Sequence, residues 1–265
     1  MKYLGFIGAG NMANAIAKGI LKSKALSPHE IILSDVNEDK LEKIKNELKV
    51  STTTDNFEVV ENSKYLILAV KPAHLENLLI EIKKCLKPNT VVISIVAGKS
   101  LSFLEKILGS DKKIIRTMPN TPALVGEAMI ALTPNKNIEQ QELESVKNLL
   151  KSVGKVEQVD EKLMNAVVGI SGSSPAYVFM FIEAMADAGV LAGLPRDKAY
   201  TFAAQSVLGS AKMLLETGKH PAILKDAVCS PGGTTIEAVK VLEENGFRAA
   251  IMDAVTACVK KCDTL

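Results

Sequence analysis

The sequence predicts an α/β protein in two parts: a doubly wound parallel-sheet domain at residues 1–160 and an all-helical domain at residues 161–265. Three observations support this. Short β-rich runs alternate with charged segments of helical period in the first part, the first run leads into a glycine-rich turn, and the β-rich runs stop near residue 160. Apolar strands separated by helices are typical of a parallel sheet covered on both faces.

Six apolar runs are the expected strands of the first domain. They lie at residues 3–8, 31–34, 65–70, 90–96, 113–118 and 129–134. The clearest helical segments between them are "EDKLEKIKNELK" at residues 38–49 and "AHLENLLIEIKKCL" at residues 73–86. Because parallel strands need long crossover connections, this alternation favours a sheet built from strand–helix–strand units.

The first strand runs into the turn "GAGNMA", a G-x-G-x-x-A pattern at Gly8, Gly10 and Ala13. Gly8 allows a tight turn, Gly10 leaves room for a pyrophosphate, and Ala13 lets the helix pack on the strand. The helix that follows offers free N–H groups and the positive end of its dipole. The turn therefore predicts a Rossmann dinucleotide site in contact with Gly8, Ala9, Gly10, Asn11 and Met12.

The second strand ends at Ser34 and Asp35. A carboxylate at this position can accept hydrogen bonds from the adenine ribose, and it would repel a 2′-phosphate. The side chains of Ser34 and Asn37 could donate to a phosphate, but no arginine lies nearby. We expect NAD(P)H as the cofactor, with a preference for NADH. Lys71, in "LAVKP" at the end of another strand, is expected to face this cofactor.

Three uncharged loops contain many hydroxyls and backbone donors where ordinary connections carry charges. They are "TMPNTPALVG" at residues 117–126, "GISGSSPAY" at residues 169–177 and "SPGGTT" at residues 230–235. Small residues in such loops also allow tight packing between elements. Three of them in one chain favour a shared pocket for a small ligand.

Composition narrows the class of partner. The formal net charge is +2, and 23% of the 265 residues are charged, so we expect no nucleic-acid partner and no polybasic membrane patch.

Four scattered cysteines without a CxxC pair indicate reduced thiols in a cytoplasm. The longest uncharged stretch, residues 163–182, contains "GISGSSP", which argues against a transmembrane segment. We expect no metal, because the sequence has no metal-ligand motif.

The segment at residues 176–193 is apolar on nearly every side, with Glu183 and Asp187 as its charged residues. A helix of this kind must be buried all round. About 105 residues can hardly enclose it, so we expect a second subunit to cover it.

The motifs "GFIGAGNMA", "LAVKP", "MPNTPALVGE", "SGSSPAYVF" and "SPGGTTIEAV", in this order, resemble those of the pyrroline-5-carboxylate reductase family. The resemblance covers essentially the whole chain. It implies reduction of L-1-pyrroline-5-carboxylate to L-proline by NAD(P)H, the last step of proline biosynthesis. It also implies a helical domain that interlocks with its partner in a homodimer, sometimes assembled into a decamer, with the active site between the cofactor domain and helices of both subunits.

The resemblance also assigns residues. Thr235 matches the hydroxyl that hydrogen-bonds the substrate ring nitrogen, and Ser230 is expected beside it as a catalytic residue. The substrate carboxylate is expected near Ser230, Gly232, Gly233 and Thr234, and further substrate contacts at Pro119 and Asn120. The matched cofactor contacts are Asn56, Ala69, Val70, Lys71, Pro72, Val96 and Ala97.

Two residues depart from the motifs of this family, and two alternative functions remain open. Ser174 replaces a glycine of the family motif, and Asp35 stands where NADPH-using members tolerate a phosphate. A 3-hydroxyacid-type dehydrogenase would carry a lysine and an asparagine after a glycine-rich turn, whereas Lys162 and Asn165 precede "GISGS". A non-catalytic dinucleotide-binding redox sensor would not need the hydroxyl-lined loop "SPGGTT".

Overall fold

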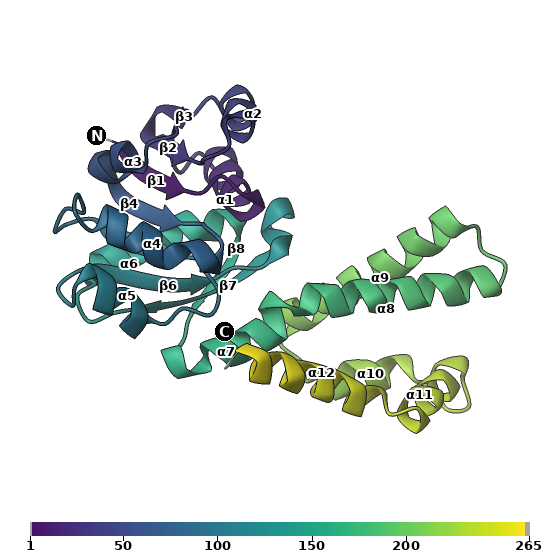
Figure 1. Ribbon diagram of the computed structural model, residues 1–265. Helices are drawn as coiled ribbons and strands as arrows, with labels where there is room; N and C mark the ends of the chain where they lie inside the picture. The colour runs from purple at the N-terminus through teal and green to yellow at the C-terminus, as the bar shows by residue number, and fades with distance from the viewer. Residues whose placement is uncertain (1, 263–265) are drawn as a thin grey trace. The chain divides into compact units, whose positions relative to one another are not determined.

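The computed structural model describes residues 2–262, and the chain divides into two compact units (Figure 1). One unit is Ser173–Cys258, and the other holds the preceding residues and the end of the C-terminal helix. The division after Gly172 lies beyond the predicted domain boundary at 160/161. Side-chain hydrogen bonds from Arg116 to Glu161 and from Asn120 to Ser171 O join residues 161–172 to the sheet. The domain boundary at 160/161 stays a prediction.

The first unit contains one eight-stranded sheet with the order β3-β2-β1-β4-β5-β6-β7-β8. Strands β1 to β6 run parallel in the order 3-2-1-4-5-6 of a dinucleotide-binding sheet, which confirms the predicted fold class. The strands are β1 (Lys2–Ile7), β2 (Ile31–Ser34), β3 (Ser51–Thr53), β4 (Ser63–Leu68), β5 (Val91–Ser94), β6 (Lys113–Met118), β7 (Ala128–Pro134) and β8 (Gly154–Gln158).

Helices cover both faces of this sheet. Apolar residues of α1 (Asn11–Lys22), α2 (Glu38–Leu48) and α6 (Gln140–Leu150) form one core with alternate strand residues such as Phe6 and Ile67. The helices α3 (Asn56–Asn62), α4 (Pro72–Ile82) and α5 (Leu101–Leu108) form a second core with residues such as Leu66 and Val92. Successive strand residues point to opposite faces, which explains why the runs are apolar throughout.

The structure adds two strands that the sequence analysis missed, and it reverses one strand. The three-residue β3, "STT", carries no apolar signal, and β8 is mostly exposed at the sheet edge. β7 runs antiparallel to β6. Only the nine residues between Met118 and Ala128 join these two strands, and that is too short for a parallel crossover.

The chain then passes through α7 (Met164–Val167) and a π-helical turn at Val168–Gly172. The second unit is helical, as the sequence predicts. It contains α8 (Ser174–Leu191), α9 (Arg196–Thr217), α10 (Pro221–Val228), α11 (Thr234–Glu244) and most of α12 (Phe247–Cys262). Its internal core is small and is formed by Ala186, Ala199 and Ala203, where α8 packs on α9.

Most of the apolar surface of α8 is exposed in the single chain. Phe179 and Met180 are 64% and 70% exposed, and Ala186 is the fully buried residue of this helix. Within residues 2–262, the stretch Glu161–Leu191 has the length and apolar character of a membrane-spanning helix. A π-helical turn and a bend at Ser173 interrupt the stretch, and it carries the apolar surface for which a second subunit is expected.

Candidate functional site

The carboxyl ends of four neighbouring strands lie in register. Ile7 of β1 pairs with Ser34 of β2 and with Leu68 of β4, and Leu68 pairs in turn with Ser94 of β5. The hydrogen bonding between the β1 and β2 segments continues one residue beyond the end of β1, because the Gly8 N–H donates to Ser34 O over 2.8 Å. The predicted cofactor residues follow directly after these strand ends, where open α/β sheets bind their ligands.

The glycine-rich turn has the two properties that a phosphate-binding turn needs. Gly8 has φ +98°, and a Cβ there would lie 2.6 Å from the carbonyl oxygen of Ala69. Gly10 has no heavy atom within 4 Å of the position of a Cβ, so the space over the turn is open. Gly10 also begins α1 without a side-chain cap, and no acidic residue lies in the first turn of that helix. The N–H groups of Asn11 and Met12 therefore lie at an uncapped helix N-terminus, where an anion is favoured.

Asp35 is tied to this turn. Its Oδ2 accepts a hydrogen bond from the Ala9 N–H over 2.8 Å, and its Oδ1 accepts one from the Asn37 N–H over 3.0 Å. Asp35 is the residue expected to bind the ribose, and its bond to Ala9 has no local sequence signal, because 26 residues separate the two. The bond fixes a negative charge beside the turn.

Ser34 is fully buried, and its hydroxyl donates to Asn56 Oδ1 over 2.8 Å. Two predicted cofactor residues are thus in contact with each other. The hydrogen of the Ser34 hydroxyl is used inside the protein, and the Asn37 side chain caps α2 by accepting from the Lys40 N–H. The Ser34 hydroxyl is therefore engaged as a donor, whereas the bond at Asn37 uses only its Oδ1 and leaves the Nδ2 donors for a phosphate.

The ends of β4 and β5 carry the remaining predicted cofactor residues. Ala69 and Val70 are half-buried after β4, while Lys71 and Pro72 are exposed at the start of α4. Val96 is buried and Ala97 half-buried after β5. All of them lie at the same sheet edge as the glycine-rich turn, because β4 and β5 end in register with β1.

Two of the three uncharged loops are joined at the exit of β6. Pro119 and Asn120 are buried there, and Asn120 Nδ2 donates to the Ser171 carbonyl oxygen over 3.0 Å. Asn120 Oδ1 accepts from the Met129 N–H over 2.9 Å. The shared composition of these loops predicts that they lie together, but no sequence signal marks Ser171 or Met129 as a partner of Asn120.

The third loop, "SPGGTT", lies in the helical unit before α11. Gly232 has φ +65°, and the Gly233 N–H donates to Ser230 O over 3.0 Å. A Cβ on Gly233 would collide with Ser230 Oγ. This turn exposes the N-terminus of α11, which has no side-chain cap. Thr234 is exposed and Thr235 half-buried in the first turn, and within the described part of the chain the Thr235 hydroxyl has no partner.

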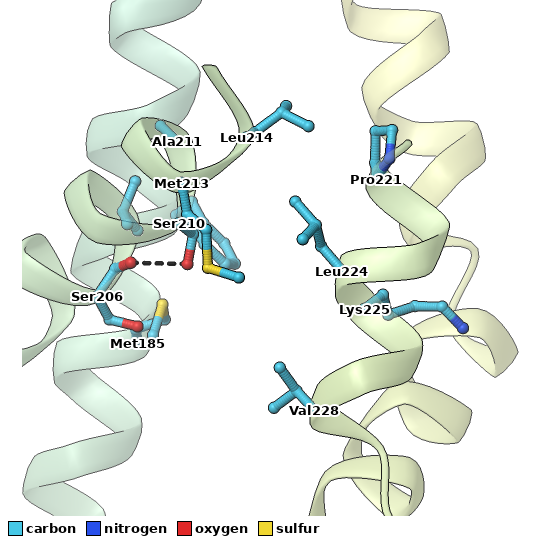
Figure 2. A pocket seen from close by; sticks show the side chains of 12 residues that line it. Met185, Ser206, Ser210, Ala211, Met213, Leu214, Pro221, Leu224, Lys225 and Val228 are labelled. Atoms are coloured by element: carbon cyan, nitrogen blue, oxygen red, sulfur yellow. Dashed lines mark hydrogen bonds between the residues drawn. The ribbon is translucent and has the colours of Figure 1, made fainter. Parts of the chain in front are cut away.

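The helical unit also holds an open cavity of about 550 Å³ between α9 and α10 (Figure 2). Its lining is mostly apolar and includes Met213, Leu214, Leu224 and Val228. Ser210 Oγ is hydrogen-bonded to Ser206 O on the same helix, and Lys225 points away from the cavity (Figure 2). The cavity therefore has an apolar surface with few polar groups available to bind a ligand.

Residues 2–262 contain no cluster of three His, Cys, Asp or Glu side chains that could hold a metal ion.

Comparison with known proteins decides the family. The chain is 49% identical over 264 residues to the pyrroline-5-carboxylate reductase of Escherichia coli (strain K12), covering 100% of this chain and 98% of that relative. It is 43% identical over 258 residues to the Arabidopsis thaliana enzyme of the same name, covering 97% and 93%. The chain belongs to the pyrroline-5-carboxylate reductase family. The match includes both units, so the resemblance seen in the five sequence motifs is confirmed.

Family models and solved structures agree with this membership. Residues 161–265 match the model for pyrroline-5-carboxylate reductase dimerisation, and residues 3–98 match that for NADP oxidoreductase, coenzyme F420-dependent. A pyrroline-5-carboxylate reductase from Coxiella burnetii superposes with a TM-score of 0.92 at 35% identity, covering 99% of this chain and 98% of that one. The Plasmodium falciparum pyrroline carboxylate reductase, solved with NADP bound, gives 0.90 at 33% identity, covering 99% and 97%.

Proposed function

We infer that this chain reduces the C=N bond of L-1-pyrroline-5-carboxylate with NAD(P)H and so forms L-proline. It is an oxidoreductase of proline biosynthesis that acts on a cyclic imine. The observation that carries this inference is the combination of full-length family membership with an open glycine-rich turn at the register-aligned strand ends.

The residues of the first unit fit a dinucleotide. The open space above Gly10 accommodates a pyrophosphate, and the uncapped N-terminus of α1 provides N–H donors for it. We propose that the cofactor contacts are Gly8, Ala9, Gly10, Asn11, Met12, Ser34, Asp35, Asn56, Ala69, Val70, Lys71, Pro72, Val96 and Ala97. When bound, NAD(P)H supplies a hydride to the imine carbon.

The loop before α11 fits the carboxylate of the substrate. Its uncapped N–H groups can hold an anion without an arginine. We propose that Ser230, Gly232, Gly233 and Thr234 frame the carboxylate, with further contacts at Pro119 and Asn120. The free hydroxyl of Thr235 then hydrogen-bonds the ring nitrogen, and Ser230 is the second catalytic residue.

The proposed reaction needs little acid–base catalysis from the protein. Hydride addition to a neutral imine would leave negative charge on nitrogen, whereas addition to the protonated iminium gives a neutral amine directly. The tasks of the chain are to orient the ring and to keep its nitrogen hydrogen-bonded. Thr235 suits both protonation states, because a hydroxyl donates to an imine and accepts from an iminium.

Cofactor preference and assembly are further parts of the proposal. The charge of Asp35 beside the turn supports a preference for NADH, since a carboxylate repels a 2′-phosphate. The exposed apolar surface of α8 and the open cavity of the helical unit support a homodimer, and dimers can assemble further into a decamer. We place the enzyme in the cytoplasm, without a nucleic-acid or membrane partner.

The test is a turnover assay with purified full-length protein. NADH and NADPH are each mixed with pyrroline-5-carboxylate, and both the loss of reduced-cofactor absorbance and the formation of L-proline are measured. We expect L-proline to form in a one-to-one ratio to oxidised cofactor, with the higher kcat/KM for NADH. Absence of turnover with both cofactors, from protein whose circular dichroism shows it folded, would contradict the assignment and favour a redox sensor.

A further inference from the structure

The π-helical turn at Val168–Gly172 leaves one backbone carbonyl without its usual donor. In an α-helix, Ser171 O would accept from the N–H of residue 175, four positions on. That residue is Pro175, which has no N–H. The next amide, that of Ala176, donates to Ser173 O instead. The local sequence therefore removes a hydrogen bond at the entrance to α8.

Asn120 replaces this missing donor from a distant part of the chain. Its Nδ2 donates to Ser171 O over 3.0 Å, across 51 residues of sequence. The amide is held from the other side, since its Oδ1 accepts from the Met129 N–H on β7. Asn120 is buried, with 8% of the residue exposed, and these two bonds fix the orientation of its amide.

A second contact supports the same junction. Met118, two residues before Asn120, lies where a side chain on Gly172 would go, because a Cβ on Gly172 would be 2.9 Å from Met118 Cε. Inside the turn, the Ser171 hydroxyl donates to Val167 O over 3.1 Å. The end of β6 thus holds the π turn by one hydrogen bond and one close packing contact.

We propose that Asn120 is a positioning residue for the reduction. It supplies the hydrogen bond that Pro175 cannot make, and it thereby holds the turn at Val168–Gly172 against the loop "MPNTP". This inference rests on the proposed function, because both loops are expected to line the substrate pocket. One amide hydrogen of Asn120 remains for a ligand, so positioning and a direct substrate contact are separate roles that an experiment can distinguish.

Asn120→Asp is the informative variant. It keeps the acceptor for the Met129 N–H but replaces the donor to Ser171 O with an oxygen. The matched control is Asn137→Asp, because Asn137 Nδ2 donates to Ser110 O and Lys112 O at the opposite end of β6. Three quantities are measured in the full-length protein: kcat with pyrroline-5-carboxylate, the Kd of NADH, and hydrogen–deuterium exchange of residues 168–176.

For Asn120→Asp we expect kcat to fall by about ten- to a hundredfold, the scale of a small misplacement at a reaction site. The Kd of NADH should change less than about twofold, because the strand ends that hold the dinucleotide are untouched. Exchange of residues 168–176 should become faster in this variant only. Adding Pro175→Ala restores an N–H opposite Ser171 O, so the double variant should regain part of the lost kcat and the slow exchange. If Asn120→Asp fails to fold, recovery of folding in the double variant with Pro175→Ala would support the proposal in the same way.

Two results would overturn the proposal. The first is equal kcat in Asn120→Asp and Asn137→Asp. The second is a loss of turnover with unchanged exchange and no recovery by Pro175→Ala, which would make Asn120 a direct ligand only. Failure of the proposed function is distinct from both, since it would be seen in wild-type protein as absence of turnover. The exchange measurements would still decide whether Asn120 holds the π turn.

Discussion

The carboxylate of Asp35 accepts a hydrogen bond from the backbone N–H of Ala9 over 2.8 Å. The end of β2 is therefore fixed to the glycine-rich turn between β1 and α1. Because Asn37 also donates to Asp35, the charge is held in one place beside the expected cofactor. We propose that this fixed charge lets the enzyme discriminate between NADH and NADPH.

Asp35→Asn should move the cofactor preference towards NADPH. The amide oxygen can still accept from Ala9, while the repulsion of a 2′-phosphate is lost. We expect the ratio of kcat/KM for NADH to that for NADPH to fall about tenfold, equivalent to about 1.4 kcal/mol. Asp39→Asn is the control, since it removes the same charge from the first turn of α2. A clear NADPH preference of the wild type would contradict our interpretation of Asp35.

Gly8 and Gly10 should respond differently to alanine. Gly10→Ala meets no atom within 4 Å, so its melting temperature should stay close to that of wild type. The added methyl group occupies the space for the pyrophosphate, and the Kd of NADH should rise roughly tenfold or more. Titration calorimetry measures this change.

Gly8→Ala is the structural counterpart. Its positive φ and the approach to Ala69 O predict a loss of stability of at least about 1 kcal/mol. Chemical denaturation measures this loss. Equal cofactor affinity in wild type and Gly10→Ala would mean that the dinucleotide does not lie over this turn.

Thr235→Ala should lower kcat by roughly ten- to a thousandfold, on the scale of losing one positioned hydrogen bond or proton donor. The Kd of NADH should be unchanged, because Thr235 is not one of the proposed cofactor contacts. Thr235→Ser keeps the hydroxyl and should retain most of the activity. Steady-state kinetics over a pH range compares the three proteins. Wild-type turnover in folded Thr235→Ala would remove this hydroxyl from the mechanism.

Phe179→Asp should weaken the proposed dimer. Phe179 is 64% exposed in the single chain, and burying a carboxylate in an apolar interface is costly. We expect the dimer Kd to rise at least about thirtyfold, as for loss of a central interface residue. Sedimentation velocity over a range of concentrations measures this shift. Lys45→Glu, on the exposed face of α2, is the control and should leave the mass unchanged. A monomeric wild type at micromolar concentration would contradict the dimer.

Much of the fold could be predicted from local patterns. Apolar runs such as residues 65–70 alternate with helical segments, and this alternation specifies a parallel sheet with helices on both faces. The positions of β3 and β8 could not be predicted in this way. A three-residue strand and an exposed edge strand bury too few side chains to leave a hydrophobic period in the sequence.

The candidate site was likewise predictable in part. The residue types of the site can be read from the sequence: glycines where the turn needs them, a carboxylate after β2, and hydroxyls in the loop before α11. Which of these groups are bonded to one another depends on the folded chain. Ser34 to Asn56, Asp35 to Ala9 and Asn120 to Ser171 are contacts across 22, 26 and 51 residues. Such contacts depend on strand order and register, which local periodicity does not encode.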